Sequence, residues 1–317
     1  MHILILGAAG MLGRKLVAAI TAGGLPATHL TLADVIAPAA PEGIACTALA
    51  VNLAAPGTAT RLIAGRPDLI FHLAAIVSGE AEADFDKGYA VNLDASRALL
   101  EAIRALPDYR PRLVFASSIA VFGAPFPDAV PDDFHLTPLT SYGTQKAMTE
   151  LLVSDYSRRG ILDGISLRLP TICIRPGAPN RAASGFFSGI LREPLGGLPA
   201  TLPVPDTTRH WFASPRSATG FFLHAARIDT DRIGPRRAMN MPGLSATVAE
   251  QIEALRRVAG QKAVDLIQVA PDPTIAAIVA SWAGNFAPDR ALGLGFTADA
   301  SFDAIIRAYL EDDAPRS

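Results

Sequence analysis

The sequence is poor in cysteine and carries little net charge, and each shortage excludes a class of protein. Its two cysteines, Cys46 and Cys173, lie far apart in apolar runs, which argues against a disulfide framework and favours a reducing cytoplasm. The formal net charge is −2, and lysines and arginines form no cluster. We therefore expect neither nucleic acid nor an anionic membrane as a partner.

Metal-binding and membrane-spanning patterns are also missing. The six histidines are scattered, with no H-x-x-x-H motif and no pairing with cysteine, so no metal site is predicted. The N-terminal run ILILGAAGMLG has no lysine or arginine before it and meets Arg14 and Lys15 soon afterwards. We therefore expect neither a signal peptide nor a transmembrane helix there.

Short apolar strands alternate with helices over the first half of the chain. Half of the 317 residues are hydrophobic, which is enough for a sizeable core. The alternation predicts an α/β fold, a Rossmann-type doubly wound parallel sheet with helices on both faces. The expected strands are 1–7, 30–35, 68–75, 112–119 and 165–173, with one more within 44–53, and the expected helices are 11–20, 59–64, 80–106 and 142–159.

The composition changes in the last part of the chain. Segments 175–185 and 194–211 are rich in proline, glycine and polar residues, and we interpret them as loops over the carboxyl ends of the strands, where α/β sheets bind ligands. A helix is predicted over 245–260, and two more follow it. The chain is thus expected to form a Rossmann domain, 1–175, and a small C-terminal lobe, 176–317, interleaved with the last strands of the sheet.

Three glycines, Gly7, Gly10 and Gly13, form a G-x-x-G-x-x-G motif between the first strand and the first helix. Glycine lets the backbone turn tightly and approach a pyrophosphate, and the helix N-terminus adds free N–H groups. Asp34 ends the second strand about 20 residues further on, where a carboxylate binds the ribose hydroxyls of NAD and repels the 2′-phosphate of NADP. The alternative for the glycine motif is a plain strand–helix turn. The alternative for Asp34 is an aspartate that caps a helix or faces solvent.

Tyr142 lies four residues before Lys146, at the start of a predicted helix. Residues at this spacing share a helix face, so the ammonium group of Lys146 is expected near the phenol, where it favours the phenolate. A phenol whose pKa is brought towards neutrality can take the proton of a substrate hydroxyl while hydride leaves the carbon. Taken alone, the pair would also describe a tyrosine and a lysine on a solvated helix.

Several motifs together resemble one enzyme family. They are GAAGMLG at the start, Asp34, HLAA at 72–75, VNLDASRALLEA at 91–102, FASSIAVFG at 115–123 and SYGTQK at 141–146. Their order and spacing resemble those of the extended short-chain dehydrogenase/reductases, the NAD-dependent epimerase/dehydratase family. The resemblance implies that Tyr142 is the general acid/base, that Lys146 binds the nicotinamide ribose and lowers the tyrosine pKa, and that Ser118 hydrogen-bonds the reacting oxygen. Strand alternation points Ser117 to the other face.

The resemblance also implies NAD as the cofactor and further residues that bind it. Ala74 and Ala75 are expected to line the cofactor groove, Asn92 to lie near the cofactor, and the segment after the sixth strand to lie against the nicotinamide carboxamide. The alternative for each of these positions is ordinary packing. Asn52 and Leu53 could cover the edge of the adenine, and the alternative for Asn52 is that of a turn residue. The predicted cofactor-binding residues are Gly7, Gly10, Met11, Leu12, Gly13, Asp34, Asn52, Leu53, Leu73, Ala74, Ala75, Asn92, Tyr142, Lys146, Pro170 and Ile172.

Substrate binding is expected at Ser118, Asn180, Arg181 and Arg209. Asn180 and Arg181 lie in a segment similar to one that holds a sugar-nucleotide pyrophosphate in the family, and Arg209 matches an arginine that many epimerases keep. The chain departs from the epimerase pattern after Arg209, because it reads HWFASPRSA where V-x-D-x-A is usual, and Phe122 replaces a tyrosine. Each arginine has the alternative of a surface ion pair.

A narrower resemblance, in the HW…SPRSA element and the closing helices, is to family members that oxidise a small four-carbon sugar acid such as D-erythronate with NAD. Arg175, Arg181 or Arg209 would then bind the carboxylate bidentately. A second hypothesis is an NAD-dependent nucleotide-sugar 4-epimerase. A third is a dinucleotide-binding sensor without catalysis, which the presence of serine, tyrosine and lysine at the matching positions disfavours.

The family resemblance further implies a homodimer. Its members often pair through two long helices, which in this chain would be 80–106 and 142–159. The expected partners are thus a small-molecule substrate, which is a sugar acid or a sugar nucleotide, and a second copy of the chain.

Overall fold

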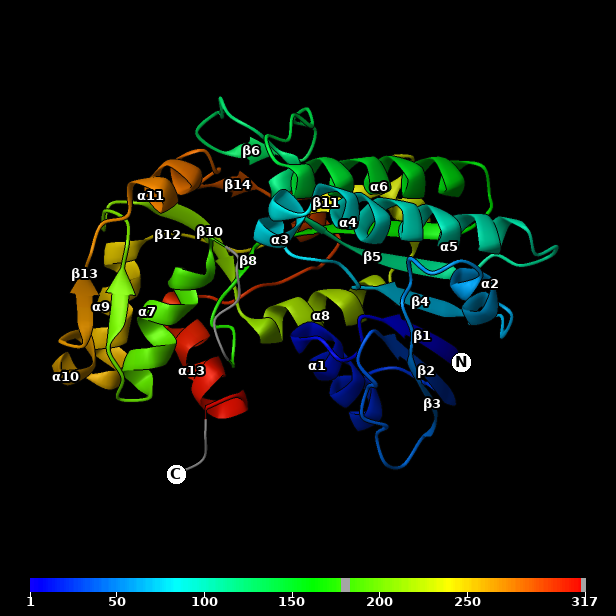
Figure 1. The fold of residues 1–317 in the computed structure, drawn as a ribbon, viewed down its shortest axis with the longest axis horizontal. Coiled ribbons are helices and arrows are strands. Elements are labelled where there is room, and N and C mark those ends of the chain that lie inside the picture. Colours follow the sequence, from blue (N-terminus) through cyan, green and yellow to red (C-terminus); the bar gives the residue numbers. More distant parts are fainter. Residues whose placement is uncertain (178–182, 315–317) are drawn as a thin grey trace. The chain divides into compact units, whose positions relative to one another are not determined.

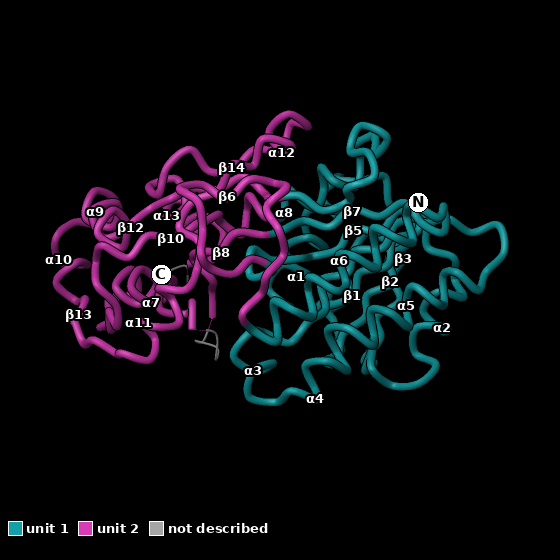
Figure 2. Tube along the Cα trace, turned by 90° about the horizontal axis from the view of Figure 1, so that it is seen from above, with its two compact units in different colours: residues 1–121, 140–168, 219–239 teal, residues 122–139, 169–218, 240–317 magenta. Residues whose placement is uncertain are grey.

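The computed structural model describes residues 1–177 and 183–314 (Figure 1). The predicted substrate residues Asn180 and Arg181 lie outside the described residues. The chain forms two compact units, unit 1 with residues 1–121, 140–168 and 219–239, and unit 2 with residues 122–139, 169–218 and 240–317 (Figure 2). The roles predicted for the two parts of the chain, in cofactor binding and in substrate binding, stay predictions.

Unit 1 is built on a large sheet. Its strands are β1 (His2–Leu6), β2 (His29–Asp34), β3 (Ala45–Ala50), β4 (Leu69–His72), β5 (Arg112–Ser118), β7 (Asp163–Leu169) and β11 (Ala238–Asn240). They form a seven-stranded sheet in the order β11-β7-β5-β4-β1-β2-β3. β1 pairs in parallel with β2 and β4, and the parallel pairing continues to β3 and β5. The predicted α/β fold with a Rossmann-type parallel sheet is confirmed.

Helices cover this sheet on two faces. They are α1 (Met11–Ala19), α2 (Thr58–Ile63), α3 (Ser78–Ala83), α4 (Phe85–Gly88), α5 (Ala95–Arg104) and α6 (Ser141–Arg158). Figure 1 shows α5 and α6 on one face and α1 on the other. Strand residues such as Leu4, Ile70 and Phe115 form one buried cluster with Leu99 and Ile103 of α5. Burial of such apolar surface holds the layers together.

Unit 2 has its own apolar core and three small sheets, β12-β10-β8, β13-β9 and β14-β6. Phe187, Phe212, Leu255 and Ile305 are among its fully buried side chains. α8 (Pro215–Ala225) begins in unit 2 and ends in unit 1. The other elements of unit 2 are β6 (Val130–Pro131), β8 (Thr171–Ile172), α7 (Gly185–Leu195), β9 (Ala200–Leu202), β10 (Arg209–Ala213), β12 (Leu244–Thr247), α9 (Val248–Ala259), α10 (Gln261–Val264), β13 (Ile267–Val269), α11 (Pro273–Ala280), β14 (Phe286–Ala287), α12 (Asp289–Gly293) and α13 (Phe302–Asp312).

The prediction of one helix over 80–106 is wrong. The segment contains most of α3, then α4, a π-helical turn (Tyr89–Asp94) and α5. Asp84 interrupts it, because its backbone is not helical, with φ −131° and ψ 87°, and its side chain accepts a hydrogen bond from Lys87 N at 3.0 Å. A short acidic side chain that accepts a hydrogen bond from the backbone N–H group three residues later caps the start of a new helix.

The prediction of one strand over 165–173 is also wrong. Pro170 separates β7, in the seven-stranded sheet, from β8, which pairs with β10 in a different sheet. Proline has no N–H group to donate to a neighbouring strand, so the pairing of β7 cannot continue through it.

The segments interpreted as loops contain regular structure. β9 lies within 194–211, β10 begins there at Arg209 and ends at Ala213, and α7 begins at Gly185 and ends at Leu195. The buried residues of α7 include Phe187, Ile190 and Leu191, a helical spacing that the sequence does show. β9 pairs with the distant β13. That pairing leaves no local pattern in the sequence, because strand pairing depends on the partner.

Candidate active site

The glycine motif makes a tight turn between β1 and α1. Gly7 has φ +87°, and a Cβ atom placed on it would lie 2.7 Å from Ala74 N. A Cβ atom on Gly13 would lie 2.2 Å from the carbonyl oxygen of Gly7. Gly10 precedes α1 and provides no side-chain cap for the first N–H groups of the helix. A loop with backbone this close, leading into a helix N-terminus, fits the pyrophosphate of a dinucleotide.

Asp34 lies at the end of β2, against this loop. Its Oδ2 accepts a hydrogen bond from Ala9 N at 2.9 Å, and its Oδ1 accepts one from Val35 N at 2.7 Å. The carboxylate is therefore fixed beside the glycine loop, as the predicted ribose-binding role requires. Asn52, which follows β3, accepts a hydrogen bond from Ala54 N at 3.0 Å. This contact is typical of a turn residue, which is the alternative interpretation of Asn52.

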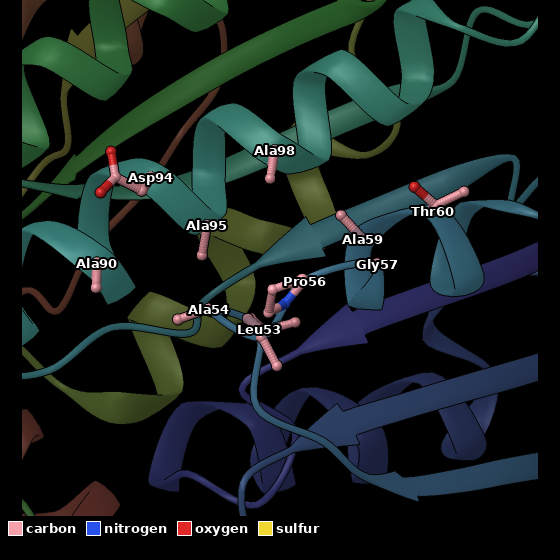
Figure 3. Close-up of a pocket in the computed structure, with 11 residues that line it drawn as sticks. Leu53, Ala54, Pro56, Gly57, Ala59, Thr60, Ala90, Asp94, Ala95 and Ala98 are labelled. Carbon is pink, nitrogen blue, oxygen red and sulfur yellow. The ribbon is translucent and has the colours of Figure 1, made fainter.

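A hollow of about 280 Å³ lies beside the turn that follows β3. Figure 3 shows the methyl groups of Ala90, Ala95 and Ala98 directed toward the turn that carries Ala54. Leu53, a predicted cofactor residue, also lines the hollow. The lining is mostly alanine, so this part of unit 1 offers apolar contact.

Asn92 holds the turn that follows β4. Its Oδ1 accepts a hydrogen bond from Ile76 N at 2.9 Å, and its Nδ2 donates to Ile76 O at 3.3 Å. The same Nδ2 donates to Gln145 Oε1 of α6 at 2.8 Å, and the Asn92 side chain is buried. Asn92 therefore acts on the turn that carries Ala74 and Ala75 and ties it to α6.

The structure fixes the start of α6, which carries Tyr142. Thr140 is the N-cap, and its Oγ1 accepts a hydrogen bond from Gly143 N at 3.1 Å. Ser141 N donates to Glu82 Oε2 of α3 at 3.0 Å. Two orphan N–H groups of the helix are thus satisfied, and Tyr142 is the second residue of a well-capped helix.

Lys146 lies beside Tyr142, as the four-residue spacing predicts. Its Nζ is 5.6 Å from the centre of the Tyr142 ring and 4.7 Å from that of Phe115. It donates a hydrogen bond to Ala116 O of β5 at 2.8 Å. Only 2% of Lys146 is exposed, and burial lowers its pKa to about 7, against the opposing effect of the Glu150 carboxylate.

Ser118 is the last residue of β5, and its Oγ accepts a hydrogen bond from Ala120 N at 3.1 Å. Ser117 is buried, and its Oγ donates to Glu150 Oε1 at 2.5 Å. The two serines thus have different partners, which agrees with the prediction that they lie on different faces of the strand. Unit 1 brings Ser118, Tyr142 and Lys146 onto two elements, β5 and α6, that contact each other.

Two buried polar groups near Lys146 were not found from the sequence. His72 of β4 lies 2.9 Å from Ser96 Oγ through its Nε2, and burial, with the charge of Lys146 as a smaller cause, lowers its pKa to about 3. Glu150 pairs with Arg168 of β7. Glu150 follows Lys146 by four residues, so the spacing that selects Lys146 would also have selected Glu150.

The candidate residues of unit 2 have contacts of their own. Thr171 and Ile172 form β8, after Pro170, and Thr171 Oγ1 lies 2.7 Å from His210 Nε2. His210 is buried and stacks on Phe187, with ring centres 5.2 Å apart, and burial lowers its pKa to about 3. His210 is therefore neutral at pH 7.

The arginines of unit 2 make intramolecular contacts. Arg209 is about half exposed and lies 3.5 Å from Glu250 Oε2, and it donates to Ser245 O at 3.2 Å. These contacts are those of a surface ion pair, the alternative interpretation of Arg209. Its role in substrate binding stays a prediction. Arg175 donates from Nε to Ile172 O at 3.0 Å. In the SPRSA element, Arg216 donates to Glu311 and Asp312 of α13 at 2.7 Å.

The described part of the chain shows neither a metal site nor a membrane span. Within 1–177 and 183–314, no group of three or more histidine, cysteine, aspartate or glutamate side chains is placed to hold a metal ion. The same residues contain no helix that is both long enough and apolar enough to span a membrane.

Comparison with known proteins places the chain in a family. Residues 3–209 match the profile of the NAD dependent epimerase/dehydratase family. The chain belongs to this family. The glycine turn and Asp34 fit the nicotinamide dinucleotide that gives the family its name, because the turn has no room for Cβ atoms and leads into an uncapped helix.

Relatives within the family match nearly the whole chain. D-erythronate dehydrogenase from Cupriavidus necator is 48% identical over 98% of this chain and 98% of its own. D-erythronate dehydrogenase from Haemophilus influenzae is 42% identical over 99% of this chain and 100% of its own. The crystal structure of the nucleoside-diphosphate-sugar epimerase from Agrobacterium tumefaciens is 61% identical, with a TM-score of 0.96, over 98% of this chain and 94% of its own. The chain is thus similar to proteins with two different names.

Proposed function

We propose that this protein is an NAD-dependent dehydrogenase that oxidises a secondary hydroxyl of a small, D-erythronate-like sugar acid. The observation that carries the proposal is the buried ammonium of Lys146 beside the phenol ring of Tyr142. The two D-erythronate dehydrogenases, similar over almost their whole length, support the choice of substrate class. The presence of Ser118, Tyr142 and Lys146 disfavours a sensor without catalysis.

Tyr142 is proposed to take the proton of the substrate hydroxyl. A cation beside the ring favours the phenolate, and Nζ of Lys146 lies 5.6 Å from the centre of the ring. The hydroxyl of Ser118 is proposed to hold the reacting oxygen by a hydrogen bond. When bound, NAD supplies the hydride acceptor. The carbon that carries the hydroxyl would lose a hydride to it while the hydroxyl proton passes to Tyr142, so that the alcohol becomes a ketone.

NAD binding is proposed along the carboxyl ends of β1, β2, β3 and β4. The N–H groups at the start of α1 would hold the pyrophosphate, and Asp34 would hold the adenosine ribose. Leu53 offers apolar contact to the adenine, and Lys146 binds the nicotinamide ribose. The fixed carboxylate of Asp34 supports NAD rather than NADP, because it would repel a 2′-phosphate.

Substrate recognition is proposed to involve residues of unit 2. A sugar acid carries a carboxylate, and arginine binds carboxylates bidentately. Arg175 and Arg209 are the candidates within the described residues, and Asn180 and Arg181 are the others. Pro170 and Ile172 are proposed to lie against the nicotinamide carboxamide.

The test is the formation of NADH from NAD and D-erythronate by the purified protein. We expect net NADH in proportion to the acid consumed, and a weaker signal with NADP. A panel of other hydroxy acids measured in the same assay defines the substrate class. Absence of net NADH with every acid of the panel would refute the proposal.

A second candidate function is an NAD-dependent nucleotide-sugar epimerase. It is favoured by the name of the 61% identical structure from Agrobacterium tumefaciens. An epimerase returns the hydride to the substrate, so it forms no net NADH and keeps its cofactor bound. Interconversion of sugar nucleotides without net NADH would support this candidate against the first.

We also propose that the protein is a cytoplasmic homodimer. Both cysteines are free, as a reducing compartment allows. Leu151 of α6 is 62% exposed and Phe85 of α4 is 58% exposed, so both helices present large apolar side chains that a second copy could cover. Light scattering after size-exclusion chromatography distinguishes a dimer from a monomer.

A further inference from the structure

A buried carboxylate near the candidate catalytic residues is not used by the mechanism above. Glu150 of α6 is 1% exposed, and Arg168 of β7 is 6% exposed. Arg168 Nε lies 3.1 Å from both carboxylate oxygens, and its Nη2 lies 3.0 Å from Oε2. A buried ion pair is weak grounds for a role in stability, because its desolvation cost can exceed the attraction. Stability alone therefore does not explain why Glu150 and Arg168 are buried at this place.

Glu150 and Lys146 hold β5 at two consecutive residues. Lys146 Nζ donates to Ala116 O at 2.8 Å, and Ser117 Oγ donates to Glu150 Oε1 at 2.5 Å. Lys146 and Glu150 are four residues apart, so one face of α6 makes both contacts. The next residue of β5 is Ser118, the proposed partner of the reacting oxygen. The two contacts thus fix the strand immediately before Ser118 against the helix that carries Tyr142.

The charge of Glu150 also acts on Lys146. The groups that face Lys146 are Tyr142 and Glu150 on its own helix, Phe115 on β5 and His72 on β4. His72 is neutral at pH 7, because burial lowers its pKa to about 3. Glu150 is therefore the negative group that favours the ammonium form of Lys146 against the cost of burial.

We propose that Glu150 is a positioning residue for the catalytic trio: through Ser117 it fixes the strand that carries Ser118, and through its charge it supports the ammonium of Lys146. Arg168 acts through Glu150, because it holds the carboxylate in the orientation that reaches Ser117. This inference rests on the proposed function for its effect on turnover. Its effect on Lys146 does not depend on the substrate.

Two variants separate the two parts of the role. Ser117→Ala removes the contact with the strand and keeps the ion pair. Glu150→Gln removes the charge and keeps a side chain of the same shape that can still accept from Ser117. Asp163→Asn is the matched control, because Asp163 also pairs with arginines of unit 1, Arg112 at 2.7 Å and Arg237 at 3.2 Å, but lies at the start of β7.

The kinetic experiment compares kcat, KM and NAD affinity. Ser117→Ala is expected to lower kcat about tenfold, the effect of one hydrogen bond, and to leave the NAD dissociation constant within about twofold. Asp163→Asn is expected to leave kcat unchanged even where its melting temperature falls by as much as that of Ser117→Ala. A change in kcat that follows melting temperature in all variants would instead make Glu150 and Ser117 purely structural.

The second experiment reads Lys146 directly. The chain has four lysines, Lys15, Lys87, Lys146 and Lys262, so NMR of the full chain labelled with ¹³C at the lysine Cε carbons gives few signals. The Lys146 signal is assigned as the one missing from Lys146→Met. We expect it to titrate near pH 7, and Glu150→Gln to move the midpoint at least about one pH unit lower. Ser117→Ala should leave the midpoint in place.

The outcomes distinguish this inference from the proposed function. A lowered midpoint in Glu150→Gln, with no activity on any sugar acid, supports the charge role and refutes the dehydrogenase. An unmoved midpoint together with an unchanged kcat in Ser117→Ala overturns the inference, whatever the substrate. If Glu150→Gln does not fold, the double variant Glu150→Gln with Arg168→Met leaves no buried guanidinium unpaired. It still lacks the Glu150 carboxylate, so its midpoint is expected to be lower than in wild type.

Discussion

Lys146 and Asn92 of unit 1 differ from Arg209 of unit 2 in how firmly their side chains are held. In unit 1, Lys146 and Asn92 are buried and contact the backbone of neighbouring elements at defined atoms. In unit 2, Arg209 is about half exposed and pairs with Glu250, itself about half exposed. Buried polar side chains with fixed partners keep one geometry, whereas exposed ion pairs contribute little to stability and re-pair easily. This difference is what our proposal expects, in which unit 1 carries the common chemistry and unit 2 carries specificity.

The largest expected effect on activity is that of replacing Tyr142, and it tests whether unit 1 carries the chemistry. Tyr142→Phe removes the hydroxyl that moves the proton, so kcat should fall by a factor of ~10²–10⁴. The dissociation constant of NAD should stay within about twofold. Tyr156→Phe on the same helix is the control, because its hydroxyl contacts Glu101, and it should keep full activity. Activity that survives in Tyr142→Phe would break the assignment of the chemistry to unit 1.

The buried ammonium of Lys146 predicts a pH-dependent stability. Its pKa is about 7 in the folded protein and about 10.4 in the unfolded chain, so between these values the unfolded chain binds more protons. The free energy of unfolding should therefore rise with pH from about 7 to about 10, by up to ~1.4 kcal/mol per pH unit, and this contribution should be flat below pH 7. The measurement is the difference between wild type and Lys146→Met in urea titrations across this range. Equal pH dependence of the two proteins would contradict the lowered pKa.

A smaller effect is expected at Asp34. Asp34→Asn keeps the shape of the side chain and an acceptor for Ala9 N, but it loses the charge. The ratio of kcat/KM for NAD to that for NADP should fall ~10–100-fold, as expected for the loss of one or two charged hydrogen bonds. Asp68→Asn is the matched control, because Asp68 accepts a backbone hydrogen bond at 2.7 Å from His2 N, at the start of β1. An unchanged ratio in Asp34→Asn would remove Asp34 from the cofactor site.

The smallest effect separates the two interpretations of Arg209. Arg209→Gln and Glu250→Gln break the same surface ion pair from its two sides, and Gln is tolerated at the capping position of Glu250. If Arg209 binds the substrate carboxylate, only Arg209→Gln raises the substrate KM, by about tenfold. Equal behaviour of the two variants would show that Arg209 is a surface residue and leave recognition to other residues of unit 2.

The sequence predicted the parallel sheet and much of the geometry around α6, because these depend on local patterns. Apolar strands, a glycine turn and a four-residue spacing are visible within short windows. The N-cap of α6 at Thr140 and the placement of Lys146 near Tyr142 follow from the same local rules.

The remaining features depend on contacts that are distant in sequence. β7 ends at Leu169, before Pro170, and β8 joins another sheet, which requires β10 as a partner. The turn held by Asn92 requires Ile76 and Gln145, which come from other segments. The helix α7 had a usable signal in Phe187, Ile190 and Leu191, but the surrounding prolines and glycines obscured it.

The most direct test of the central claim follows the hydrogen that leaves the substrate. Purified protein is incubated with NAD and D-erythronate that carries deuterium at both secondary carbons, and the reduced cofactor is analysed by mass spectrometry. The account predicts net formation of deuterated NADH in wild type and its loss in Tyr142→Phe. Cofactor that stays oxidised and bound, with deuterium retained in the sugar acid, would contradict it.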